Sequence, residues 1–233
     1  MKSQAVRAKI MTFASSKGGV GKSTSCAAIA GALAARGFKI IVLDLDQNQT
    51  LFRWFSKHLS VADFVTVKAV APERFKSVLD QTKGEGADFI LVDVAGAYEA
   101  TIIKAIAASD LVITPSKLSE PDLREAAKIL SEVQAFNDQF GSTIRHRLLI
   151  NEAESLDPHY QRHALAEVDG SALVRFDQLM MRRAPYREIF ISGHPPHQAD
   201  KGRVPVRKAV AELDAIIDEL MDVLNLSKKA RAA

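Results

Sequence analysis

The residues with the clearest chemistry lie near the start of the chain, in the string Lys17-Gly18-Gly19-Val20-Gly21-Lys22-Ser23-Thr24. An apolar run, residues 10–14, precedes the string, and a helix-patterned segment follows it to about residue 36. This order of strand, glycine loop and helix is the context of a phosphate-binding loop, because the amides of the loop and of the helix N-terminus point at an anion. The sequence therefore predicts a nucleoside triphosphate site.

Two side chains of the string have expected roles at this site. Lys22 would contact the β- and γ-phosphates, and Ser23 would offer its hydroxyl to Mg²⁺. The predicted nucleotide-binding residues here are Gly18, Gly19, Val20, Gly21, Lys22, Ser23 and Thr24.

The loop departs from the ordinary pattern in two ways. Ser16 stands where the first glycine is usual, and a second lysine, Lys17, lies inside the loop. The string resembles the deviant Walker A motif of the ParA/MinD family. This resemblance implies an ATPase with ATP and Mg²⁺ as cofactors. It also implies that Lys17 is catalytic together with Lys22, because in this family the extra lysine reaches the phosphates of the partner in a nucleotide-sandwich homodimer.

Acidic residues close two further apolar segments. Residues 39–46 read as a buried strand that ends in Asp44 and Asp46, which would project to one side because strand side chains alternate. Residues 88–93 read as a second buried strand that ends in Asp93, the pattern of a Walker B element that holds Mg²⁺ through water. Doubly wound sheets bind their ligands at this carboxyl edge.

The segment after Asp44 resembles the switch I region of the family, although Gln47 replaces its usual proline. By that resemblance Asp46 would position the attacking water, and Asp44 would lie in the water shell of Mg²⁺. The alternative for either acid is that it opens the following turn. Gly96 is expected to offer an amide to the γ-phosphate as part of switch II. Asn151, at the end of a later strand, would contact the adenine edge, with turn capping as its alternative.

Strand patterns alternate with helix patterns along the whole chain, which predicts an α/β fold with one doubly wound, mostly parallel sheet flanked by helices. We expect a single domain over residues 1–233, with a short basic tail from about residue 227. The predicted strands are residues 10–14, 39–46, 65–70, 88–93, 110–115, 147–151 and 172–176. The predicted helices are residues 21–36, 51–58, 72–83, 98–108, 120–140, 158–168, 177–191 and 206–224.

Composition excludes several classes of protein. The 233 residues are 47% hydrophobic and 25% charged, which is typical of a globular protein, and no apolar run approaches the length of a membrane span. The first nine residues lack the apolar core of a secretory signal, so we expect a cytoplasmic protein. The single cysteine, Cys26, excludes an internal disulfide. It also argues against the nitrogenase iron protein, which bridges its cluster with two cysteines per subunit.

Basic residues gather in the C-terminal third. The net charge is only +3, but residues 175–208 hold eight basic residues against three acids, a net charge of +5. Such a cluster can attract the DNA backbone. A solvated surface that only keeps a helix soluble is the alternative. The predicted DNA-binding residues are Arg182, Arg183, Arg187, Lys201, Arg203 and Arg207.

The resemblance to ParA-type ATPases covers most of the chain and implies an ATP-dependent DNA-partitioning ATPase of the short ParA group. Such a protein would dimerise on ATP, bind double-stranded DNA without sequence preference and associate with the nucleoid, until a ParB-like partner stimulates hydrolysis. Relatives that act on T-DNA borders also resemble residues 44–54. The alternatives are a MinD-like membrane-cycling ATPase and a metabolic P-loop ligase. The basic tail lacks the large apolar residues of a membrane anchor, so the sequence predicts no membrane partner.

Overall fold

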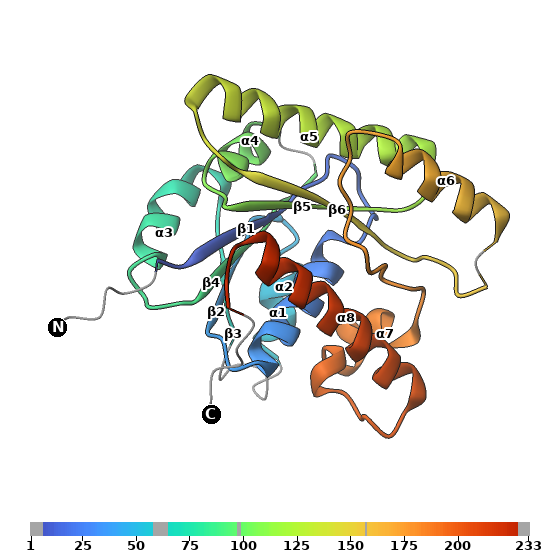
Figure 1. Cartoon of the computed structure of the whole chain (residues 1–233). Coiled ribbons are helices and arrows are strands. Elements are labelled where there is room, and N and C mark those ends of the chain that lie inside the picture. Colours follow the sequence, from blue (N-terminus) through green and yellow to red (C-terminus); the bar gives the residue numbers. More distant parts are fainter. Residues whose placement is uncertain (1–6, 58–64, 97–98, 157, 228–233) are drawn as a thin grey trace.

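A computed structural model describes residues 7–57, 65–96, 99–156 and 158–227 (Figure 1). Its six strands form one parallel sheet in the order β3-β2-β4-β1-β5-β6, which confirms the predicted doubly wound architecture. The strands are β1 (Lys9–Phe13), β2 (Ile40–Asp44), β3 (Val65–Ala69), β4 (Phe89–Asp93), β5 (Leu111–Ser116) and β6 (Arg145–Ile150). The helices are α1 (Lys22–Ala35), α2 (Thr50–Phe55), α3 (Phe75–Thr82), α4 (Glu99–Ala107), α5 (Glu120–Phe140), α6 (His159–Asp169), α7 (Ala184–Ser192) and α8 (Val204–Val223). Two short 3₁₀ turns are η2 (Pro72–Arg74) and η3 (Pro196–Gln198).

The helices cover both faces of the sheet (Figure 1). Helices α1, α2, α7 and α8 pack on one face, and α3, α4 and α5 pack on the other. Strands β2, β4 and β5 are buried along their whole length because each is covered on both faces, as expected of a parallel sheet. Cys26 lies fully buried in α1. None of the described helices combines the length and hydropathy needed to cross a bilayer.

The register of the sheet brings three functional segments to one edge. β1 lies between β4 and β5, so the phosphate loop that follows it emerges from the middle of the sheet. β2 pairs with β4 so that Asp44 stands directly opposite Asp93. The carboxyl ends of these parallel strands therefore place both acids next to the loop.

Several predicted elements differ from the structure. β5 continues through Pro115 to Ser116. Its pairing with β1 ends at Ile113, so the missing N–H of Pro115 removes no hydrogen bond between these two strands. The strand predicted at residues 172–176 is reduced to a single parallel bridge between Leu148 and Arg175.

The helix predicted over residues 177–191 begins seven residues later, at Ala184. Residues 177–183 instead run beside the end of β6, where the amide of Met180 donates to the carbonyl of Ile150 (2.9 Å) and the amide of Arg182 to that of Ala153 (2.8 Å). Pro185 stands in the first turn of α7, where its fixed backbone angle favours a helix start. This extended segment moves two predicted DNA-binding arginines off the helix.

Candidate nucleotide site

The phosphate loop connects β1 to α1 in the centre of the sheet. Gly19 and Gly21 have positive φ angles of 75° and 95°, a backbone region that favours glycine. Gly18 and Gly19 are exposed, and a Cβ atom on either would meet nothing within 4 Å, so the tip of the loop is open to solvent. The first amides of α1 carry no side-chain cap. Together these amides and the helix dipole form an anion site, as the glycine spacing predicts.

Lys22 lies against this loop. Its Nζ donates to the carbonyl oxygen of Lys17 at 2.8 Å, which folds the side chain over the loop. Burial lowers the pKa of Lys22 below its ordinary value, and the charges of Asp93 and Asp46 act in the opposite direction. Both acids therefore lie close enough to Lys22 for their negative charges to stabilise its protonated form.

Asp93 forms the floor of the site at the end of β4. Its Oδ2 accepts a hydrogen bond of 2.6 Å from the hydroxyl of Ser23, the first-turn residue of α1. Its Oδ1 is buried and has no hydrogen-bond partner among the residues that the structure describes. Burial raises the pKa of Asp93 to about 7, against the opposing effect of the Ser23 hydroxyl. A buried carboxylate with a free oxygen beside a serine hydroxyl fits a hard divalent cation, which prefers oxygen ligands.

Asp44 and Asp46 have different surroundings. β2 ends at Asp44, so Asp46 lies two residues beyond the strand and does not project with Asp44 from one strand as predicted. Asp44 is fully buried and accepts hydrogen bonds from the amides of Asp46 (3.1 Å) and Phe52 (3.0 Å), so it anchors the start of α2. Burial raises the pKa of Asp44, and these amides act against the shift. The metal-shell role of Asp44 stays a prediction.

Asp46 is half-buried in the turn after β2, and its Oδ1 accepts the amide of Asn48 at 2.8 Å. On the other side of the loop, Gly96 packs on Ser16. A Cβ atom on Gly96 would come within 2.7 Å of the Ser16 carbonyl oxygen, so only glycine permits this contact. The segment after β4 therefore touches the phosphate loop directly.

Asn151 lies immediately after β6 and is buried against the loop. Its Nδ2 donates to the carbonyl of Val20 (2.9 Å) and to the hydroxyl of Ser25 (3.0 Å). The same nitrogen stands 2.5 Å from the position of a Cβ atom on Gly21, so any other residue at position 21 would collide with it. Asn151 thus supports the loop, and its contact with the adenine edge stays a prediction.

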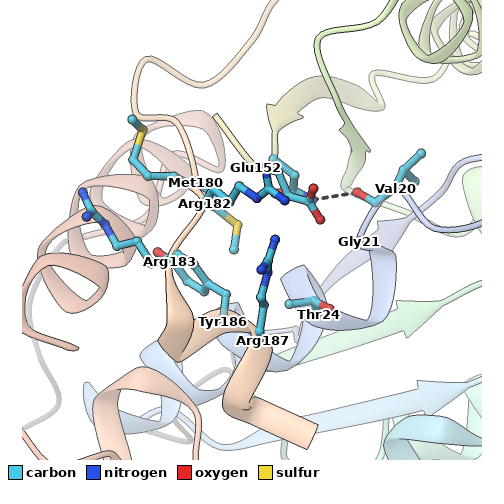
Figure 2. Close-up of a pocket in the computed structure, with 11 residues that line it drawn as sticks. Val20, Gly21, Thr24, Glu152, Met180, Arg182, Arg183, Tyr186 and Arg187 are labelled. Carbon is cyan, nitrogen blue, oxygen red and sulfur yellow. Dashed lines mark hydrogen bonds between the residues drawn. The ribbon is translucent and has the colours of Figure 1, made fainter. Parts of the chain in front are cut away.

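A pocket opens next to the loop (Figure 2). The side chain of Arg187 points into it, whereas that of Arg183 points away. Sequence reasoning missed Tyr186 and Glu152 as part of this wall, because residues 150–153 and 180–187 meet only in the folded chain. The lining residues are Val20, Gly21, Thr24, Asn151, Glu152, Met180, Met181, Arg182, Arg183, Tyr186 and Arg187.

The six predicted DNA-binding residues have different surroundings. Arg182 and Arg187 line the pocket beside the loop. Arg183 is largely buried, and its Nε donates to the Oε1 of Glu212 at 2.6 Å. This ion pair holds the Arg183 guanidinium inside the protein. The remaining three residues lie exposed at the start of α8, and their DNA-binding role stays a prediction. They are Lys201, Arg203 and Arg207.

Comparison with known proteins identifies the family. The VirC1 protein family model matches residues 8–152, which include the loop, Asp93 and Asn151. This chain belongs to the VirC1 family. Among its relatives, a virC1 protein of Rhizobium rhizogenes is 31% identical over 122 residues, 51% of this chain and 53% of that protein. Protein ParA of Rhizobium radiobacter is 22% identical over 210 residues, which cover 88% of this chain and 93% of that protein. The predicted resemblance to ParA-type ATPases is therefore confirmed.

Solved structures agree on the fold of this VirC1 family member. The ATP complex of a McdA variant from Cyanothece superposes with a TM-score of 0.72 over 95% of this chain and 98% of that one, at 14% identity. Identity this low shows a shared fold only. That McdA structure holds ATP.

Proposed function

We propose that this protein is a ParA-type ATPase that binds Mg-ATP, dimerises around it and uses hydrolysis to end the dimer. The observation that supports the proposal best is the loop geometry. The exposed glycines and the uncapped amides of the helix start meet the part-buried Ser23–Asp93 pair and Lys22 at one point of the sheet edge. This arrangement suits a triphosphate with a divalent cation, because it offers amides and ammonium to the phosphates and oxygens to the metal.

Each residue of the site has a proposed role. Lys22 turns from the Lys17 carbonyl to the β- and γ-phosphates, and the amides of residues 18–24 hold the phosphate oxygens. Ser23 and Asp93 hold the magnesium ion, Asp93 through water, and Asp44 orders its water shell. The ion neutralises phosphate charge when bound. Asp46, which lies near Lys22, orients the attacking water.

The dimer carries the biological function. Lys17 of each subunit adds positive charge at the phosphates of the partner, where it stabilises charge that develops during transfer. Slow hydrolysis of ATP then sets the lifetime of the dimer, and a ParB-like partner shortens this lifetime by stimulating hydrolysis. Two copies of one basic surface on a dimer bind a polyanion far more tightly than one copy, because the second contact is intramolecular.

The start of α8 is the proposed DNA surface. Lys201, Arg203 and Arg207 are exposed there. The guanidinium of Arg203 is also paired with Glu188 (2.8 Å), and that of Arg207 donates to the carbonyl oxygens of Lys201 and Gly202. These bonds orient the arginines and leave this surface weakly basic in one subunit. Useful affinity would therefore require the dimer.

An electrophoretic assay with duplex DNA of arbitrary sequence tests the proposal. We expect binding with ATP, little binding with ADP, and weaker binding as salt rises. The double variant Arg203→Ala/Arg207→Ala should lose binding, whereas the control Lys76→Ala, an exposed lysine on α3, should retain it. Binding that ignores the nucleotide or the salt would contradict the DNA function. ATP-dependent sedimentation with liposomes would favour the membrane-cycling alternative instead.

A further inference from the structure

Lys17 is held by its own chain. Its Nζ forms an ion pair with the carboxylate of Asp122, in the first turn of α5. The next residue back, Ser16, donates its hydroxyl to Glu125, one turn further along the same helix. Both contacts join residues more than 100 positions apart. The two residues by which this loop departs from an ordinary phosphate loop are thus the two that α5 holds.

Asp122 is arranged to receive a cation. Its side chain is 6% exposed, and its Oδ2 accepts a hydrogen bond of 2.8 Å from the hydroxyl of Ser119. Its Oδ1 is buried, and the ammonium of Lys17 is the charge that faces it. A buried carboxylate without a counter-charge is costly, so Lys17 cannot leave Asp122 without a free-energy penalty.

The backbone of Lys17 is also engaged within its own subunit. Its carbonyl oxygen accepts the hydrogen bond from Lys22, the lysine proposed to turn toward the phosphates. A phosphate that attracts Lys22 would therefore release one contact on Lys17. The Asp122 contact would remain, because it involves a different atom and a different helix.

We infer that Asp122 is a positioning residue that retains Lys17 in its own subunit and thereby sets how readily the ATP dimer forms. This inference rests on the proposed function of Lys17 in trans. A lysine paired with Asp122 cannot reach the phosphates of a partner, so only the fraction of molecules with a released lysine is competent to dimerise. The apparent affinity of the dimer falls by that fraction.

The variant Asp122→Asn tests this inference. It keeps the shape of the side chain and its contact with Ser119 but removes the charge that holds Lys17. In sedimentation velocity experiments with saturating ATP, we expect half-maximal dimerisation at an about fivefold lower protein concentration than for the wild type. The matched control is Glu120→Gln on the same helix turn. Glu120 pairs with Arg124, both side chains are 75% exposed, and the control should match the wild type.

A second background separates release of Lys17 from a structural effect on α5. In Lys17→Ala protein there is no ammonium to release, so adding Asp122→Asn should leave dimerisation unchanged. A shift of equal size in both backgrounds would overturn the inference, as would wild-type behaviour of Asp122→Asn itself. A wild type that stays monomeric with ATP would instead reject the proposed function.

Circular dichroism should first confirm that Asp122→Asn is folded. If it is not, Glu125→Gln takes its place, because the side chain of Glu125 is 25% exposed and accepts a single hydrogen bond from Ser16. Releasing Ser16 should move dimerisation in the same direction. No change in that variant would overturn the inference.

Discussion

At the scale of single residues, the two loop lysines have different surroundings and should fail differently when removed. Lys22 is the partly buried lysine near Asp93 and Asp46, whereas Lys17 reaches outward to α5. We expect Lys22→Ala to weaken ATP binding by about tenfold or more, because it deletes a charge-assisted contact to phosphate. Lys17→Ala should bind ATP normally and lose hydrolysis. Isothermal titration and a phosphate-release assay measure the two effects, and equal behaviour of both variants would contradict their assigned roles.

A buried histidine links stability to pH. His146 on β6 shares a 2.9 Å hydrogen bond between its Nε2 and the hydroxyl of Thr114, and burial lowers its pKa to about 4. In the unfolded chain the pKa is about 6.5, so above that pH both states are neutral and stability is unaffected. Below it the unfolded chain binds a proton first, and stability falls until about pH 4, by roughly 3 kcal/mol.

Urea unfolding of His146→Gln between pH 4 and pH 7 tests this linkage. The variant should show a smaller loss of unfolding free energy on acidification than the wild type, because its side chain does not titrate. His163→Gln is the control, since His163 has a 68% exposed side chain on α6. Identical pH slopes for the wild type and His146→Gln would contradict the assignment.

The residues of the site were predictable where their roles depend on neighbours in sequence. The glycines of the loop, Lys22 and Ser23 lie in one string, and Asp93 closes an apolar strand. The partners of Lys17 were not predictable, because nothing in the loop specifies which helix lies beside it. Asp122 reads as an ordinary first-turn acid of α5, a position that the helix dipole favours in any helix, and Glu125 reads as an ordinary acid of the next turn.

At the scale of elements, α1 illustrates how closely the layers pack. Gly31 lies in its middle, and a Cβ atom there would stand 2.5 Å from the Cβ of Pro195. Glycine to alanine normally stabilises a helix by up to about 1 kcal/mol. Here the collision should outweigh that gain, and we expect Gly31→Ala to lower the unfolding free energy by about 1–2 kcal/mol. Chemical denaturation measures the change, and a more stable variant would show that the loop before η3 moves freely.

The elements that local patterns predict well are those buried between two layers. β2 and β4 are apolar runs that each end in an aspartate, and α5 begins at Glu120 and ends at Phe140 as predicted. The prediction that residues 177–183 are helical was wrong for a physical reason. Leu179, Met180 and Met181 suit a helix face equally well, but the open side of β6 offers backbone partners that no local pattern reveals.

That same segment depends on one buried acid. Glu212 of α8 accepts hydrogen bonds from the Arg183 guanidinium (2.6 Å) and the Tyr186 hydroxyl (3.0 Å). Its carboxylate therefore fixes the wall of the pocket beside the phosphate loop. Arg183, which the charge pattern of the sequence placed among the DNA-binding residues, is instead paired with Glu212 inside the protein. A count of basic residues therefore overestimates the number that are free to contact DNA.

At the scale of the whole molecule, the proposed function makes this protein a subunit whose site is completed by a second copy. The phosphate loop, Asp46 and Asp93 lie at one sheet edge, and the extra lysine beside them is retained by α5. ATP would hold two copies together, and hydrolysis would let each lysine return to Asp122. The central claim is that Lys17 acts in the site of the partner.

Mixing two inactive variants tests this claim most directly. Lys17→Ala and Asp46→Ala should each lack ATP hydrolysis alone. In a mixed dimer, the site on the Lys17→Ala chain keeps its own Asp46 and receives Lys17 from the partner, so it is complete. An equal mixture should recover about a quarter of the wild-type phosphate release, because half of the dimers are mixed and each holds one complete site. If the mixture stays as inactive as its components while both variants bind ATP and dimerise, Lys17 acts within its own subunit and the account is contradicted.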